Sequence, residues 1–136
     1  MMTTMRLRAA AVAALVLAAG CGLGRPRPAM LPAEVRIPVG ATRTVDGGEL
    51  AISFARVSED SRCPRGVQCV TAGNAVVALL LQERGAASQA VDLNTGQEPR
   101  SARYEGYLVE LVALEPVPEQ GRTPTDYVAV LRVSEM

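Results

Sequence analysis

The chain has 136 residues, with fourteen arginines against fourteen acidic residues and neither histidine nor lysine. This length predicts a single domain with one modest core. The missing histidine removes the side chain that most often acts as a base near neutral pH. Nucleic-acid binding requires a clustered basic face, whereas the charges here are interspersed. Composition therefore disfavours catalysis and nucleic-acid binding.

The first element, residues 1–20, has the features of a secretory signal. Arg6 and Arg8 precede an apolar run over residues 9–19 that ends in small side chains. A charged start, a short apolar stretch and a small-residue cleavage point are typical of export signals. A membrane-spanning helix needs about 20 apolar residues, and this run is roughly half that length.

The stretch Leu17-Ala18-Ala19-Gly20-Cys21 resembles the lipobox of bacterial lipoproteins, in which the signal is cut before the cysteine and the cysteine is acylated. The resemblance implies a mature chain that begins at a lipidated Cys21. Such a chain is held on a lipid bilayer, at the cell surface or on the periplasmic face; ordinary secretion is the alternative. Residues 21–33 contain three prolines and no periodicity, so we expect a linker there and a domain over 34–136.

From residue 34 onward the patterns predict β structure. Asp46-Gly47-Gly48 separates two β-type segments and predicts a hairpin turn. In the segment that follows, Leu50, Ile52 and Phe54 share one face, as in a strand with one buried side. The expected strands are 35–39, 42–45, 49–57, 74–82, 89–93, 107–114 and 127–133.

These segments, with turn signals between them and no clear helix, predict an all-β fold of about seven strands, an antiparallel sandwich or a small barrel. The segments 75–81 and 107–114 are apolar on both faces and should form central strands. Periodicity alone does not distinguish a buried strand from a buried helix, so an α+β fold is the alternative.

Cys63 and Cys69 are the two cysteines that follow Cys21. In an exported chain such a pair is expected to form a disulfide, which here closes a seven-residue ring. A structural zinc site needs four ligands, usually cysteine or histidine, and the chain does not supply them. We therefore predict one disulfide and neither a metal nor another cofactor.

The stretch 60–75 contains Asp-Ser-Arg-Cys-Pro, four further residues, a second cysteine and an Ala-Gly-Asn-Ala tail. It resembles a family of small uncharacterised bacterial secreted proteins and lipoproteins, and the resemblance extends over residues 45–133. The chain departs from the family pattern at Thr71, where the family has an aromatic residue, often tryptophan. The resemblance implies no activity for this chain.

Asp60, Arg62 and Arg65 form a candidate recognition loop within this stretch. Arg62 is placed to pair with Asp60, with Glu59 or with a carboxylate across the sheet. Binding residues often lie on rigidly held loops, and Arg65 on a tethered ring suits a carboxylate or phosphate group. The simpler interpretation is structural, in which the stretch orders a crossover between two sheets.

Two further interpretations of the same loop are open. Glu59, Asp60 and loop carbonyls have the chemistry of a Ca²⁺ site. Pro64-Arg65-Gly66 within a disulfide ring also has the form of an inhibitor loop that offers Arg65 to a trypsin-like protease, since a preorganised loop binds at a lower entropic cost.

Catalytic signatures are missing from the sequence, including Gly-x-Ser-x-Gly, Ser-x-x-Lys and a phosphate-binding glycine loop. The expected function is a monomeric, lipid-anchored binding or structural module of the cell envelope without catalytic activity. Its expected partners are the bilayer, through acylated Cys21, and an envelope protein or small ligand. A secreted ligand-binding or protease-inhibitor-like protein that presents Arg65 is the alternative.

Overall fold

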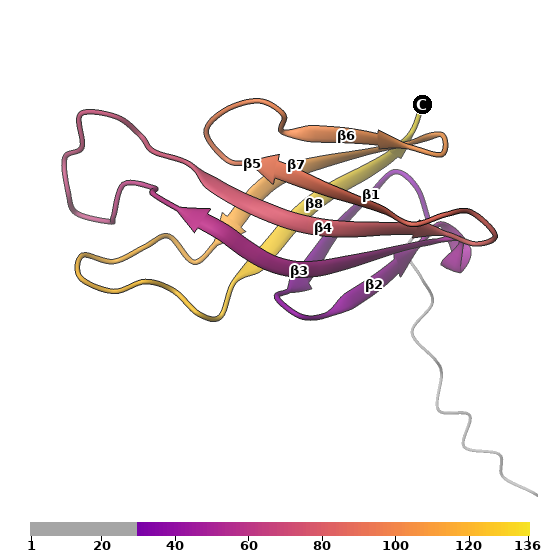
Figure 1. Ribbon diagram of the computed structural model, residues 1–136, viewed down its shortest axis with the longest axis horizontal. Coiled ribbons are helices and arrows are strands. Elements are labelled where there is room, and N and C mark those ends of the chain that lie inside the picture. The colour runs from indigo at the N-terminus through magenta and orange to yellow at the C-terminus, as the bar shows by residue number, and fades with distance from the viewer. Residues whose placement is uncertain (1–29) are drawn as a thin grey trace, which may run out of the picture.

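The computed structural model describes residues 30–136, which form two four-stranded antiparallel sheets packed face to face (Figure 1). One sheet has the strand order β1-β8-β7-β6, and the other has the order β2-β3-β4-β5. The predicted all-β sandwich is confirmed. The expected signal peptide 1–20, Cys21 and most of the linker 21–33 lie outside the described residues. The strands are β1 (Ala33–Pro38), β2 (Thr42–Val45), β3 (Leu50–Asp60), β4 (Ala75–Glu83), β5 (Gln89–Asn94), β6 (Ser101–Tyr104), β7 (Tyr107–Glu115) and β8 (Val128–Glu135).

The described part of the chain has eight strands, one more than the sequence predicted. The additional strand is β6, which pairs with β7 from Ser101 opposite Glu110 to Tyr104 opposite Tyr107. Its four residues are too few for an alternating pattern to be recognised against the surrounding loop. β6 is therefore recognised only by its pairing with β7.

The core between the sheets consists mainly of aliphatic side chains. Leu50, Ile52 and Phe54 are fully buried on the inner face of β3, as their spacing predicted. Ala129 and Leu131 oppose them from β8 and are also fully buried. Burying a large apolar side chain contributes roughly 1.5–3 kcal/mol, so these inner faces supply most of the energy that fixes the sheets and the loops at their ends.

The two segments predicted as central strands are interior strands of their sheets. β4 lies between β3 and β5, and β7 lies between β8 and β6. The α+β alternative is therefore wrong for residues 74–82, where β4 hydrogen-bonds to a neighbour on each side. The run is apolar on both faces although only the inner face is covered, and Leu80 remains 40% exposed on the outer face of β4.

Tyrosine hydroxyls fasten two of the turns to the sandwich. The hydroxyl of Tyr107 donates a hydrogen bond of 2.8 Å to the carboxylate of Asp46, which begins the short 3₁₀ turn Asp46–Gly48 between β2 and β3. The hydroxyl of Tyr104 donates to the carbonyl oxygen of Ala87 at 2.7 Å, in the β4–β5 turn. The predicted Asp46-Gly47-Gly48 turn is thus confirmed, with a tyrosine from the other sheet as its anchor.

The chain crosses from one sheet to the other after β1 and again after β5. The disulfide-bearing segment 61–74 instead connects β3 to β4, which are neighbours in one sheet. The expectation that this segment is a crossover between the sheets is therefore wrong. It is a long hairpin loop, and its length allows it to reach the other sheet through side chains.

The long loops gather at one end of the sandwich (Figure 1). We call this the loop end; it comprises the β3–β4 loop (61–74), the β5–β6 loop (95–100) and the β7–β8 loop (116–127). β1 begins at the opposite end, because Ala33 pairs with Val133 near the end of β8, whereas Pro38 pairs with Val128 next to the β7–β8 loop. The part of the chain that precedes β1 therefore joins the domain at the end away from these loops.

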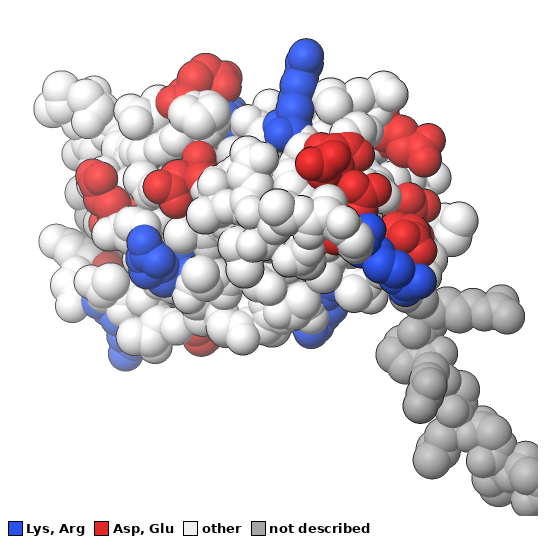
Figure 2. Space-filling view, turned by 45° about the vertical axis from the view of Figure 1, so that its right-hand side comes forward, with Lys and Arg blue, Asp and Glu red and all other residues white. Residues whose placement is uncertain are grey.

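The end at which β1 begins is rich in acidic side chains. Figure 2 shows several of them gathered near this end, beside a central surface that is largely uncharged. The short turns and strand ends here carry Arg84 and five acidic residues, namely Asp46, Glu49, Glu83, Glu105 and Glu135.

Candidate functional site

Arg62 joins the β3–β4 loop to the other sheet. Its Nε donates to Oδ1 of Asp60 and its Nη2 donates to Oδ2, both at 2.8 Å. Its Nη1 donates to the carbonyl oxygen of Leu114 at 2.6 Å, and its Nη2 donates to that of Pro116 at 2.9 Å. The hydroxyl of Tyr127 completes the cluster with a 2.9 Å hydrogen bond to Oδ2 of Asp60. We call Asp60, Arg62 and Tyr127 the Arg62 clamp.

The Arg62 clamp is largely shielded from solvent. The side chain of Asp60 is 4% exposed and that of Arg62 is 13% exposed. Two register shifts in β3, between Phe54 and Arg56 and between Val57 and Glu59, precede Asp60 and bring it opposite Ala75. Bulges of this kind bend a strand and redirect its side chains. Of the three partners considered for Arg62, Asp60 is the one with which it pairs, and Arg62 thereby joins loops that come from different sheets.

Burial and hydrogen bonding act in opposite directions on the Asp60 carboxyl. Burial raises its pKa, but the hydrogen bonds from Arg62 and Tyr127, together with the Arg62 charge, bring the pKa below the ordinary value for aspartate. Burial, and then the hydrogen bond to Asp60, raises the pKa of the Tyr127 hydroxyl. The clamp is therefore held as an ionised carboxylate, a guanidinium and a neutral phenol.

The lowered pKa of Asp60 predicts a specific loss of stability in acid. A carboxyl whose pKa is lower in the folded state contributes stability above its unfolded pKa, about 3.9, and loses that contribution as the pH falls through the folded pKa. We expect the difference in unfolding free energy between wild type and Asp60→Asn to be largest above about pH 4 and to shrink toward pH 2. Urea denaturation at a series of pH values measures it.

Tyr127→Phe serves as the companion variant in that experiment. Removing the Tyr127 hydroxyl removes one of the hydrogen bonds that lower the pKa of Asp60. The acid loss should then be smaller than in wild type and should be complete at a higher pH. Parallel pH profiles for wild type and Asp60→Asn would contradict this account of the clamp.

The predicted disulfide between Cys63 and Cys69 is formed, with 5.9 Å between the two Cα atoms. The ring is tied down at several points besides the sulfurs. The amide of Cys63 donates to the carbonyl of Ala72 at 3.0 Å, and the amide of Arg65 donates to the carbonyl of Pro118 at 2.8 Å. Gly66 turns the ring with a positive φ of 77°, a conformation that glycine adopts without strain.

The three residues of the candidate recognition loop therefore lie in two different environments. Asp60 and Arg62 are internal to the clamp, whereas the side chain of Arg65 is exposed on the ring. The adjacent acids Glu59 and Asp60 do not converge as a Ca²⁺ site requires. Asp60 lies opposite Ala75 within the clamp, while Glu59 lies opposite Val76 and is exposed.

The base of the β3–β4 loop is stacked on the β5–β6 loop. The side-chain amide of Asn74 donates to Oδ1 of Asn94 at 2.8 Å, and the amide of Gly96 donates to Oδ1 of Asn74 at 2.8 Å. The carbonyl of Gly73 approaches so closely that a Cβ on Gly96 would lie 2.3 Å from its oxygen. Asn94 is buried and its hydrogen bonds hold the two loops together, a role that its sequence context does not indicate.

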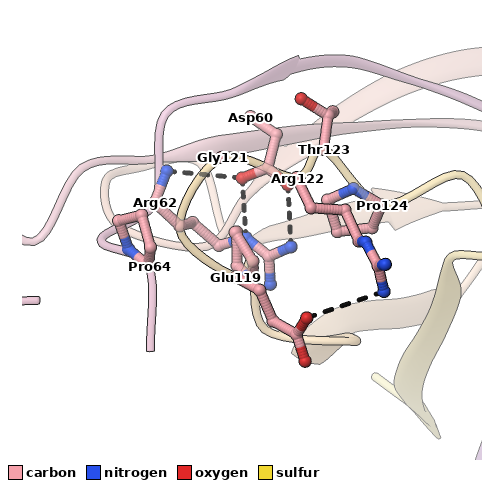
Figure 3. A pocket seen from close by; sticks show the side chains of 9 residues that line it. Asp60, Arg62, Pro64, Glu119, Gly121, Arg122, Thr123 and Pro124 are labelled. Carbon is pink, nitrogen blue, oxygen red and sulfur yellow. Dashed lines mark hydrogen bonds and ion pairs between the residues drawn. The ribbon is translucent and has the colours of Figure 1, made fainter. Parts of the chain in front are cut away.

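Beside the clamp, the two long loops enclose a hollow of about 210 Å³ (Figure 3). Asp60 and Arg62 line it from one side, and Glu119 and Arg122 line it from the β7–β8 loop. The segment around Arg122 lies between the expected strands 107–114 and 127–133, and no site residue was predicted in it. No local motif points to these residues, because their position opposite the disulfide ring depends on how the two loops meet. The remaining lining residues are Pro64, Pro118, Gly121, Thr123 and Pro124.

Within residues 30–136, no group of three or more cysteine, histidine, aspartate or glutamate side chains is arranged to hold a metal ion. The described residues also include no helix of the length and apolar character needed to cross a membrane. Comparison with protein-family models, curated proteins and solved structures finds no match to the chain.

Proposed function

We propose that the chain is a monomeric, non-catalytic binding module of the cell envelope, anchored in a lipid bilayer through acylated Cys21 and engaging an envelope protein or small ligand at its loop end. The Arg62 clamp carries this proposal. A binding surface made of loops needs loops of fixed shape. Arg62 provides this by joining the β3–β4 loop to the carbonyls of Leu114 and Pro116 on the other sheet.

The positions of the two ends of the sandwich support binding at the loop end. A lipid on Cys21 would approach the domain from the end at which β1 begins, because β1 follows directly on the linker. The loop end would then point away from the bilayer, where a partner can reach it.

The state of Asp60 supports a binding role over a catalytic one. A general base must offer a free oxygen to its substrate. Both carboxylate oxygens of Asp60 accept hydrogen bonds within the clamp, Oδ1 from Arg62 and Oδ2 from Arg62 and Tyr127. The lowered pKa also makes this carboxylate a weak base.

The geometry of Arg65 favours side-chain recognition over the alternative of a protease-inhibitor loop. An inhibitor loop pairs its main chain with the protease. The amide of Arg65 already donates to Pro118, and Arg65 forms a parallel β-bridge with Glu119. Its guanidinium remains exposed for a carboxylate or phosphate on a partner.

Detergent-phase partitioning tests the anchor. We expect the wild-type chain expressed in its host to enter the detergent phase and Cys21→Ala to remain in the aqueous phase, because the substitution removes the acylated thiol. Intact-mass analysis of the wild-type N-terminus provides the second readout. Equal partitioning of both proteins, or an N-terminus other than an acylated cysteine, would contradict the anchoring.

Cross-linking on intact cells tests recognition at the loop end. We expect Arg65→Ala to reduce recovery of a specific partner by at least about tenfold, the effect of losing a central arginine contact. Arg84→Ala is the matched control, since Arg84 is an exposed arginine in the β4–β5 turn at the opposite end. Equal losses in both variants, or none in either, would contradict binding through the disulfide ring.

A further inference from the structure

We propose that the hollow between the β3–β4 and β7–β8 loops binds a carboxylate carried on a small apolar body, such as the C-terminus of a peptide or a short free acid. This inference rests on the proposed binding role of the loop end and specifies one ligand chemistry for it. It is carried by the donors, charges and walls of the hollow shown in Figure 3.

On the side formed by the Arg62 clamp, the hollow offers a ligand a hydrogen-bond donor and no free acceptor. Asp60 is saturated by Arg62 and Tyr127, so its oxygens are not available to a ligand. Arg62 has five N–H groups and uses four of them within the protein, at Asp60, Leu114 and Pro116. One N–H on Nη1 is left, in a guanidinium that lines the hollow. A ligand group that contacts Arg62 must therefore be a hydrogen-bond acceptor.

Arg122 supplies the second set of donors, at the opening of the hollow. Its side chain is 79% exposed, and the described residues give it a single ion pair, to Glu119 at 3.7 Å. An exposed pair of this length contributes little to stability. A carboxylate that enters the hollow can therefore replace Glu119 as the partner of Arg122 at low cost, and a planar guanidinium binds a carboxylate through two parallel hydrogen bonds.

The charges of the hollow favour a single negative charge on the ligand. Two arginines, Arg62 and Arg122, face two acids, Asp60 and Glu119. Arg62 is neutralised by Asp60 within the clamp, which leaves Arg122 as the cation that a ligand can engage. A monoanion that pairs with Arg122 leaves one uncompensated negative charge, that of Glu119, whereas a phosphate dianion would add a second.

The walls of the hollow determine the rest of the ligand. Pro64, Pro118 and Pro124 supply small, rigid apolar sections of a lining that is otherwise mostly polar. The volume of about 210 Å³ is below the roughly 300–1,000 Å³ of sites that enclose drug-sized ligands. The hollow therefore accommodates a carboxylate with one small apolar group, while the remainder of a longer ligand would lie outside.

Amide chemical shifts of the full chain in detergent micelles test the proposal. N-acetylalanine is the probe, and N-acetylalaninamide is the matched compound without the carboxylate. We expect N-acetylalanine, but not the amide, to shift resonances of residues 118–124 and 62–65. Arg122→Gln should weaken this binding by about tenfold, the loss of one charge-assisted contact. Arg132→Gln, which removes an exposed arginine from β8, should leave it unchanged.

Three results would overturn the proposal: equal shifts from the amide compound, tighter binding of inorganic phosphate, or binding that Arg122→Gln does not weaken. A peptide with a free C-terminus that binds more tightly than the same peptide amidated identifies a peptide terminus as the source, and equal affinity of free acid and peptide identifies a small acid. Cross-linking that depends on Arg65 while no carboxylate binds would leave the proposed function standing and remove this inference alone.

Discussion

Replacing Gly73 with alanine is expected to destabilise the domain by more than about 3 kcal/mol. Gly73 has a positive φ of 69°, and a Cβ added to it would lie 1.8 Å from the carbonyl oxygen of Ser61. Both the backbone conformation and the space therefore exclude a side chain. To accommodate the methyl group, the β3–β4 loop must separate its two strands at the point where Ser61 and Asn74 exchange hydrogen bonds.

Gly66→Ala is the control that separates backbone strain from contact. Gly66 has a positive φ of 77°, but nothing lies within 4 Å of a Cβ placed there. Its substitution should therefore cost only the left-handed backbone penalty, about 1–2 kcal/mol. Urea unfolding followed by circular dichroism measures both variants, since the chain has no tryptophan for fluorescence. Equal destabilisation of the two variants would show that the close contact with Ser61 does not contribute to the loss of stability.

Arg62→Ala is expected to lower the unfolding free energy by about 3–5 kcal/mol. The substitution leaves the carboxylate of Asp60 buried without its cation and removes donors from the carbonyls of Leu114 and Pro116. Losing one partner of a shielded, fully hydrogen-bonded pair is much more damaging than losing an exposed one, because the remaining charge is neither solvated nor paired. The β3–β4 and β7–β8 loops should also become more mobile, because Arg62 no longer joins them.

The exposed pair between Arg84 and Glu49 provides the comparison. Its atoms are 3.4 Å apart and its side chains are 71% and 46% exposed, so Arg84→Ala should change stability by less than about 1 kcal/mol. Chemical denaturation measures the free energies, and hydrogen exchange of residues 61–74 and 116–127 measures the loosening of the loops. If Arg62→Ala lowers the unfolding free energy no more than Arg84→Ala does, the Arg62 clamp contributes no more stability than an exposed ion pair.

These two predictions concern the same property of the loop end. Gly73 allows the base of the β3–β4 loop to stack against its neighbours, and Arg62 fastens the loop to the opposite sheet. The proposed binding at Arg65 and in the hollow needs both, because a ligand that meets a preformed surface avoids the entropy of ordering it. A variant that loosens the loops should therefore bind its ligand less tightly even though its sandwich remains folded.

Local sequence patterns were sufficient to predict most of the strands of the sandwich. Alternation at Leu50, Ile52 and Phe54 defined the inner face of β3, and the Asp46-Gly47-Gly48 turn defined its start. Such features are readable because side chains alternate across a strand and because glycine tolerates positive φ. The Cys63–Cys69 bridge was readable for a different reason, since these are the two cysteines that follow Cys21 in a chain expected to be exported. The acylation of Cys21 stays a prediction from its local motif.

What depended on tertiary structure was the set of partners brought together at the loop end. Arg62 finds the carbonyls of Leu114 and Pro116, 52 and 54 residues along the chain, and a main-chain carbonyl has no residue type by which it can be recognised in advance. The approach of Arg122 to the disulfide ring, and the existence of β6, likewise follow from which strands and loops become neighbours. Sequence determined which residues turn inward and where the chain turns. The packing of the two sheets decided which loops meet, because that depends on contacts between segments far apart in the chain.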